Sequence, residues 1–143
     1  MNRGIEFHDS VIKDVIREGE DLLVTFSRVV VHETLGTPGV DAGICVSQMA
    51  TLRFKGGMLS PETLLCPVCI TDGELRLGDQ LLDNMVPVHI DHVGPTQFSC
   101  NVYDSHAVFT LLRMTGAGVQ IRMHGKPDYM DDFPGSTNPG TTN

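Results

Sequence analysis

Two cysteines stand three positions apart in the segment Cys66-Pro67-Val68-Cys69. Thiols at this spacing can bind zinc or exchange disulfides. A closed zinc site needs further ligands, and the remaining cysteines, Cys45 and Cys100, do not form a second such pair. The segment also leads into a strand-like run, where residues three apart point to opposite faces of a sheet. We therefore expect structural cysteines, no metal ion and no cofactor.

Histidines gather in the segment His89-Ile90-Asp91-His92, where a carboxylate could orient an imidazole for metal binding or proton transfer. On a regular strand His89 and Asp91 share one face, and His92 lies on the other. His89, Asp91 and His92 could complete a metal site with Cys66 and Cys69 only if the fold brings residues 66–69 and 89–92 close together. We interpret them as a solvated polar face. The alternative is an enzyme that depends on a metal ion or a small ligand. The site of that enzyme would use His8, Asp9, His89 and His92.

Serine, histidine and aspartate, the residue types of nucleophilic catalysis, occur side by side in Phe7-His8-Asp9-Ser10. The same residue types recur in a different order at Tyr103-Asp104-Ser105-His106. Members of a catalytic triad usually converge from separate segments, and the chain has no Gly-x-Ser-x-Gly elbow. We therefore expect a structural role, in which Asp9 and Ser10 accept backbone N–H bonds and start the first strand.

Acidic residues outnumber basic ones by 18 to 10, which gives a formal net charge of −8. Residues 62–104 hold seven acidic residues and one basic residue, Arg76, so this stretch has a net charge of −6. Such a surface repels polyphosphates, which excludes nucleic acid and anionic membranes as expected partners. A basic protein partner or a metal ion fits better. The candidate binding residues are Asp72, Glu74, Asp79, Asp83 and Asp91.

Period-2 alternation of apolar residues predicts a mainly β, antiparallel sandwich or partly open barrel of eight or nine short strands. The expected strands cover residues 11–16, 22–31, 50–55, 66–70, 75–77, 86–91, 98–102, 108–114 and 119–123. The alternation slips near Arg28, where a bulge could restore it. Pro87 lacks an amide donor and indicates an edge strand.

Glycine and proline mark the expected turns. We expect hairpins at residues 71–74 and 115–118, a turn at Gly94-Pro95, a loop over 34–43 and a strand end at 125–127. Ser60 and Pro61 could start one short helical turn, because serine caps helices and proline suits their first position.

The length of 143 residues predicts one domain, residues 1–134, followed by a disordered tail, 135–143, that lacks apolar residues. The first residues show no apolar signal-peptide core, and no run approaches the roughly 20 apolar residues of a spanning helix. We expect a cytoplasmic protein with four reduced thiols.

The pattern Phe7-His8-Asp9-Ser10-x-Ile12-x-x-Val15, then Gly19 and Leu22-x-Val24-x-Phe26, resembles the opening of small bacterial β-proteins. Some of these are uncharacterised, and others are grouped as immunity proteins that neutralise toxins from neighbouring cells. The likeness covers about the first quarter of the chain. It implies an antiparallel β-fold in bacterial cytosol and transfers no catalytic residue. The function expected from charge and resemblance is a non-catalytic, immunity-like module that binds a basic protein.

Overall fold

The computed structural model describes residues 1–83 and 85–136, and within these residues the chain forms nine β-strands and no helix. The strands are β1 (Asn2–Glu18), β2 (Asp21–Thr34), β3 (Gly43–Phe54), β4 (Met58–Ser60), β5 (Val68–Leu77), β6 (Gln80–Leu82), β7 (Val86–Pro87), β8 (Ile90–Tyr103) and β9 (Phe109–Phe133). All pairings are antiparallel, so the predicted fold class is confirmed.

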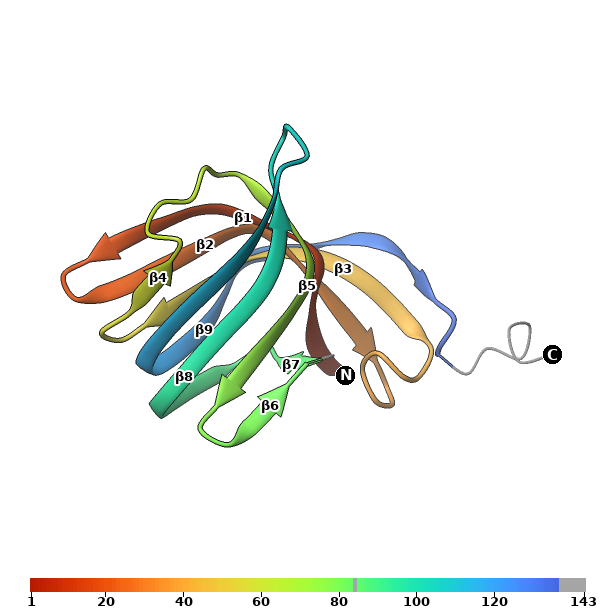
Figure 1. Cartoon of the computed structure of the whole chain (residues 1–143). Coiled ribbons are helices and arrows are strands. Elements are labelled where there is room, and N and C mark those ends of the chain that lie inside the picture. Colours follow the sequence, from red (N-terminus) through yellow and green to blue (C-terminus); the bar gives the residue numbers. More distant parts are fainter. Residues whose placement is uncertain (84, 137–143) are drawn as a thin grey trace.

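One sheet carries all nine strands and partly closes into a ring (Figure 1). Six strands form the ring in the order β5-β8-β9-β3-β2-β1, and β1 returns to β5 through the pairs Val11↔Cys69 and Ile12↔Val68. The short strands β4, β6 and β7 attach to β9, β5 and β1. β7 contains Pro87 and pairs with β1, which confirms the predicted edge strand.

The strand β9 belongs to two parts of the molecule. It pairs with β8 from Phe109 to Ile121 and with β3 from Val119 to Phe133. Its last third therefore leaves the ring with the beginnings of β1 and β3 and the end of β2, and Figure 1 shows this extension on the right of the ring. The surface of this extension forms one wall of the largest cavity described below.

Phenylalanines from three strands occupy the middle of the core. Phe7 of β1 lies 4.7 Å from Phe98 of β8 and 6.2 Å from Phe26 of β2, measured between ring centroids. All three are buried, in a cluster completed by aliphatic side chains. Because fully burying one such side chain contributes about 1.5–3 kcal/mol, this contact helps to hold β1 against β8 although the two strands are not neighbours in the sheet.

The segment Phe7-His8-Asp9-Ser10 lies where β1 bulges to meet β5. Asp9 has φ 66°, and the register between β1 and β2 shifts after Glu6. The Ser10 hydroxyl repairs the shift by donating to the Glu6 carbonyl at 3.0 Å and accepting from Val30 N–H at 3.2 Å. The structural reading is therefore correct for Ser10, but the segment does not start β1, which begins at Asn2.

Both hairpins predicted at Asp-Gly and Gly-Ala-Gly are wrong, because these segments lie inside longer strands. Residues 71–74 lie within β5, where the register to β8 shifts between Ile70 and Asp72. A Cβ on Gly73 would lie 3.2–3.4 Å from Cys100, Phe98 and Phe7, so the glycine provides space for the core. The β5–β6 hairpin turns later, at Gly78.

Residues 115–118 lie within β9, where backbones approach closely. A Cβ on Gly116 would lie 2.9 Å from the Lys55 carbonyl oxygen, and one on Gly118 would lie 2.8 Å from that of His92. The predicted turn at Gly94-Pro95 is a bulge within β8, and the strand end predicted at 125–127 is wrong because β9 continues to Phe133. The helical turn at Ser60 is wrong too, because Ser60 ends β4 and pairs with Arg113.

Other sequence predictions are confirmed. A register shift between Phe26 and Val29 is the bulge expected near Arg28, and the loop expected over 34–43 joins β2 to β3. The four cysteines are not paired with one another in the structure, and their reduced state in the cell stays a prediction. Most of the predicted tail, residues 137–143, lies outside the described residues, whereas Ser136 N–H still donates to the Val40 carbonyl at 2.9 Å. Across residues 1–83 and 85–136, no helix is available that could cross a bilayer.

Candidate functional site

A polar groove crosses the outer face of β5, β8 and β9. Outward-facing residues line it because alternate residues of each strand point away from the core. One row of the sheet runs from Glu74 through Ser99 to Arg113, and the next runs from Asp72 through Asn101 to Leu111. The groove has a volume of about 520 Å³, and Asp83, which follows β6, completes its acidic side.

The groove brings three of the five predicted acidic residues together. Asp72, Glu74 and Asp83 line it with Arg113, and Asn101 Nδ2 donates to Asp72 Oδ1 at 2.8 Å. Asp79 lies instead in the turn between β5 and β6. Asp91 lies on β8, where Arg122 approaches its carboxylate at 3.5 Å and offsets its charge.

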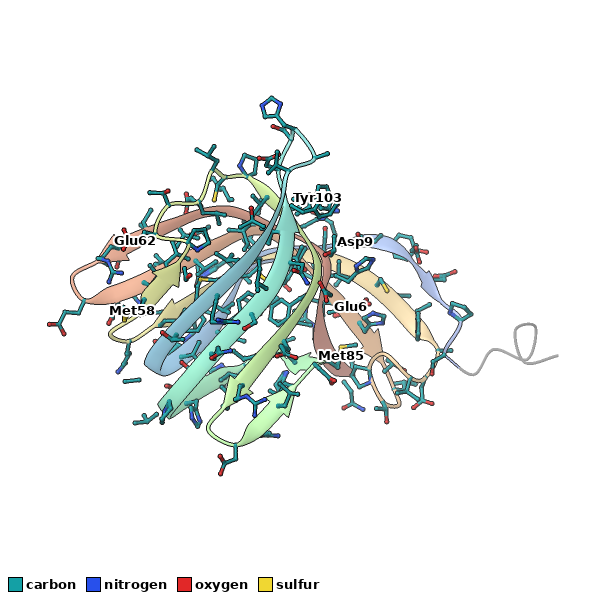
Figure 2. All side chains as sticks on the ribbon, viewed as in Figure 1. Glu6, Asp9, Met58, Glu62, Met85 and Tyr103 are labelled. Carbon is teal, nitrogen blue, oxygen red and sulfur yellow. The ribbon has the colours of Figure 1, made fainter. Side chains whose placement is uncertain are left out.

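A second and larger cavity, which we call the trough, lies on the extension. Its volume is about 640 Å³, and its walls come from β1, β2, β3, the end of β9, the β2–β3 loop and Met85. One sheet row across it joins Gly4, His32, Cys45 and Asp131. A Cβ on Gly4 or Gly39 would overlap the Met85 side chain, so these glycines make room for the methionine in the wall. Figure 2 shows Glu6 and Met85 close together in this part of the molecule.

A histidine and a carboxylate pair at the floor of the trough. His32 Nε2 donates to Glu6 Oε2 at 2.8 Å, and the imidazole packs edge-on against Phe133 with ring centroids 4.8 Å apart. The His32 side chain is 6% exposed, whereas that of Glu6 is 38% exposed. Glu6 thus reaches from a buried partner to the open cavity. The Cys45 thiol lies 3.7 Å from His32 Nδ1.

Cysteine, histidine and glutamate in contact could form a nucleophilic triad, but the electrostatics oppose this chemistry. Burial raises the pKa of the Cys45 thiol, and the charges of Asp131 and Glu6 raise it further. A nucleophilic cysteine needs positive surroundings that stabilise its thiolate. Cys45 is therefore kept as a neutral thiol at neutral pH.

His8 stands between the two cavities. A third hollow of about 140 Å³ shares Glu6 and His8 with the trough, and Asp72 and Asp83 with the groove. The His8 ring contacts the carbonyl oxygen of Thr71 on β5 through Nδ1. This hydrogen bond raises the pKa of His8; burial opposes the rise, and the charges of Asp9, Glu6 and Asp72 add to it. The three hollows therefore form one continuous acidic surface.

No protein family, curated protein or solved structure matches the chain. The function is therefore inferred from the geometry and charge of the chain itself.

The four residues of the alternative enzyme site are divided between different places. His8 and Asp9 line the trough, whose lining contains neither His89 nor His92. His89 is exposed before β8 begins, and His92 Nε2 is buried without a hydrogen-bond partner. Among the described residues, no three histidine, cysteine, aspartate or glutamate side chains are placed to hold a metal ion, Cys66 and Cys69 included.

Sequence reasoning missed Glu6, His32 and Cys45. They come from three strands, and no spacing in the chain connects them. One signal was available: His32 follows Val29-Val30-Val31 and is a titratable residue at the end of a buried run. A buried histidine needs a hydrogen-bonding partner, which the fold supplies from β1.

Proposed function

We propose that this protein is a non-catalytic binding module that holds a cationic protein against its acidic surface. The observation that carries the proposal is the charge around the three connected hollows, where seven carboxylates are accompanied by one arginine, Arg113. We call these carboxylates the acidic belt. The belt consists of Glu6, Asp9, Asp72, Glu74, Asp83, Asp131 and Asp132.

The belt suits a partner that is captured quickly. Charges of one sign around a concave surface focus the electrostatic field and increase the association rate of an oppositely charged protein. Exposed charges are screened beyond about 10 Å at 0.1 M ionic strength, so this increase depends on salt. Nucleic acid and anionic membranes stay unsuitable partners, because the carboxylates repel their negative charges.

An exposed apolar patch beside the groove supports a protein partner over a free ion. Tyr103 and Phe109 pair across β8 and β9 with ring centroids 5.7 Å apart. Phe109 is 69% exposed, and Leu111, which lines the groove, is 55% exposed. Protein interfaces combine an apolar centre with a polar rim, and aromatic side chains are enriched in them. The charges of the acidic belt would determine the association rate, and the apolar patch would determine the dissociation rate.

An immunity-like mode of action, in which the protein covers a basic toxin, is one form of this proposal. The residues that carry the resemblance, Phe7 and Ser10 above all, have structural roles here, so the charge supports the proposal more strongly than the resemblance does. The enzyme alternative would instead require the histidines to act in turnover.

The test measures association and dissociation rates with a cationic partner recovered from the source cells, identified and purified. The double variant Asp72→Asn/Glu74→Gln removes two charges from the belt. We expect it to slow association by roughly threefold to tenfold at low salt and to leave dissociation nearly unchanged. The matched control, Glu20→Gln/Glu62→Gln, removes two exposed charges from the β1–β2 turn and the β4–β5 loop.

Two results would contradict the proposal. One is association that is equally fast at low and high salt. The other is an equal effect of the belt and control variants, because the net charge rather than the belt would then be responsible. Turnover of a substrate that is lost in His8→Ala or His89→Ala would support the enzyme alternative instead.

A further inference from the structure

We infer that the trough is a receptor site for one alkylguanidinium group, the chemical group at the end of an arginine side chain. This inference deepens the proposed function and rests on it for the source of the group, which a cationic partner would present. Its evidence is separate from the groove: a cavity of about 640 Å³, a pair of buried His32 and half-exposed Glu6 at its floor, and apolar walls.

The floor of the trough is built to fix the position of a carboxylate. Glu6 Oε2 accepts from His32 Nε2 at 2.8 Å, and His32 is itself held by burial and by the perpendicular ring of Phe133. A carboxylate has two oxygens, and one hydrogen bond to His32 leaves Glu6 Oε1 for another donor. Because Glu6 is 38% exposed, a ligand in the trough can reach it.

A second carboxylate approaches the same floor from the opposite side. Asp131 of β9 pairs in register with Cys45 of β3, which in turn pairs with His32 of β2. The charges of Asp131 and Glu6 both raise the pKa of the Cys45 thiol. The sulfur atom of Cys45 therefore lies in the negative potential of two carboxylates. Among the residues that the structure describes, no lysine or arginine lines the trough to neutralise this potential.

The walls favour a guanidinium over a compact ammonium ion. Met85, Met130, Phe133, Val40 and Pro38 surround the polar floor. A guanidinium is flat and weakly hydrated, carries five N–H donors and packs against aromatic and apolar surfaces, whereas an ammonium ion holds its water more strongly. The alkyl stem of the ligand would lie along the methionine side chains, which adapt to irregular shapes.

The test titrates the purified, full-length protein with n-butylguanidine, n-butylamine and n-butylurea while amide NMR signals are recorded. We expect n-butylguanidine to saturate and to shift the signals of His32, Cys45 and Phe133. The amine should bind more weakly, and the uncharged urea, which has nearly the same shape, should not saturate. Equal binding of the urea, or shifts confined to other residues, would overturn the inference.

Variants locate the site. Asp131→Asn should weaken n-butylguanidine binding by about tenfold, the effect of losing one charge-assisted hydrogen bond. Glu6→Gln should weaken binding at least as much, but it also changes the hydrogen-bond partner of buried His32. If the Glu6 variant folds poorly for that reason, the result for Asp131→Asn is the one that decides. Glu20→Gln, the control on the β1–β2 turn, should bind like the parent protein. Equal affinities for all variants would overturn the assignment.

A final arm separates this inference from the proposed function. The peptide acetyl-Ala-Arg-Ala-amide should displace n-butylguanidine, and the same peptide with citrulline should not. If the peptide competes but a cationic protein partner shows no salt-dependent association, the proposed function fails and the site remains as a receptor for a free guanidinium compound. If belt variants slow association but n-butylguanidine does not bind, this inference fails alone.

Discussion

Ser10 is fully buried, and its hydroxyl joins two strands at the point where their register slips. Replacing it with alanine would leave Val30 N–H and the Glu6 carbonyl without this partner. A buried group that loses its hydrogen bond costs about 1–3 kcal/mol, so Ser10→Ala should lower the free energy of unfolding by that amount. Urea denaturation measures it. Ser27→Ala, at an exposed position on β2, is the control and should change stability by less than about 0.5 kcal/mol.

His8 makes stability depend on pH. Its pKa is raised from 6.5 in the folded protein, first by the hydrogen bond to the Thr71 carbonyl and then by nearby carboxylates. A raised pKa means that the proton binds the folded state more tightly, so the contribution is complete below the unfolded pKa and disappears as the pH rises through the folded one. His8→Asn should therefore destabilise the protein more at pH 5 than at pH 8, as measured by urea denaturation. A loss that is equal at both pH values would contradict this origin.

The four thiols should differ in reactivity. Burial, with a smaller contribution from Asp72, raises the pKa of Cys100 to about 12. Because the thiolate is the reactive form, iodoacetamide should leave Cys100 unmodified in the native protein at pH 8. After unfolding without a reductant, mass spectrometry should find all four cysteines labelled. Fewer than four labels would reveal a disulfide, and fast native labelling of Cys100 would show that its environment opens.

The strands of this protein are long because bulges restore their alternation after each slip. A register shift occurs within five of the paired strand contacts, and β9 runs for 25 residues. In the sequence, a glycine inside a strand looks like a glycine at a turn, because both interrupt the period-2 pattern. This is why the strand segments could be predicted from their periodicity, whereas Asp72-Gly73 and Gly116 were assigned to hairpins.

Gly116 offers a direct test of this distinction. At a hairpin tip, an added methyl group would meet solvent, but here it would lie 2.9 Å from the Lys55 carbonyl oxygen and 3.2 Å from Phe54 Cβ. Gly116→Ala should therefore cost about 1–3 kcal/mol of unfolding free energy, as measured by chemical denaturation. Ala117→Ser, at the exposed neighbouring position, is the control. Similar stabilities for both variants would mean that the two backbones do not approach so closely.

At the scale of the whole molecule, the groove and the trough differ in whether their lining residues can be grouped from the sequence alone. Asp72, Glu74 and Asp83 lie near one another in the chain, and their surplus charge indicated a common surface before any fold was known. Glu6, His32 and Asp131 come from positions up to 125 apart in the numbering and meet only because three strand pairings align them. Long-range register of this kind leaves no local pattern.

The acidic belt should cost the molecule stability. Like charges held close together repel each other in the folded state, and salt screens the repulsion. The triple variant Asp72→Asn/Glu74→Gln/Asp83→Asn should therefore melt at a higher temperature than the parent at low salt, by the equivalent of a few tenths of a kcal/mol, and the difference should shrink at high salt. Differential scanning calorimetry checks both. Glu20→Gln/Glu62→Gln should gain less, and a destabilised triple variant would argue against repulsion.

The last third of β9 has a consequence for self-assembly. Between His124 and Phe133 it pairs with β3 and has no second strand partner among the described residues, so its outer backbone groups could template a strand of another copy. Pro127 within this stretch has no backbone N–H to donate, and two register shifts bend the stretch. A filament built on this edge would also stack Asp131 and Asp132 at the spacing of about 4.8 Å between strands. Salt screens that repulsion, so concentrated solutions of high ionic strength are where fibrils of this protein should first grow.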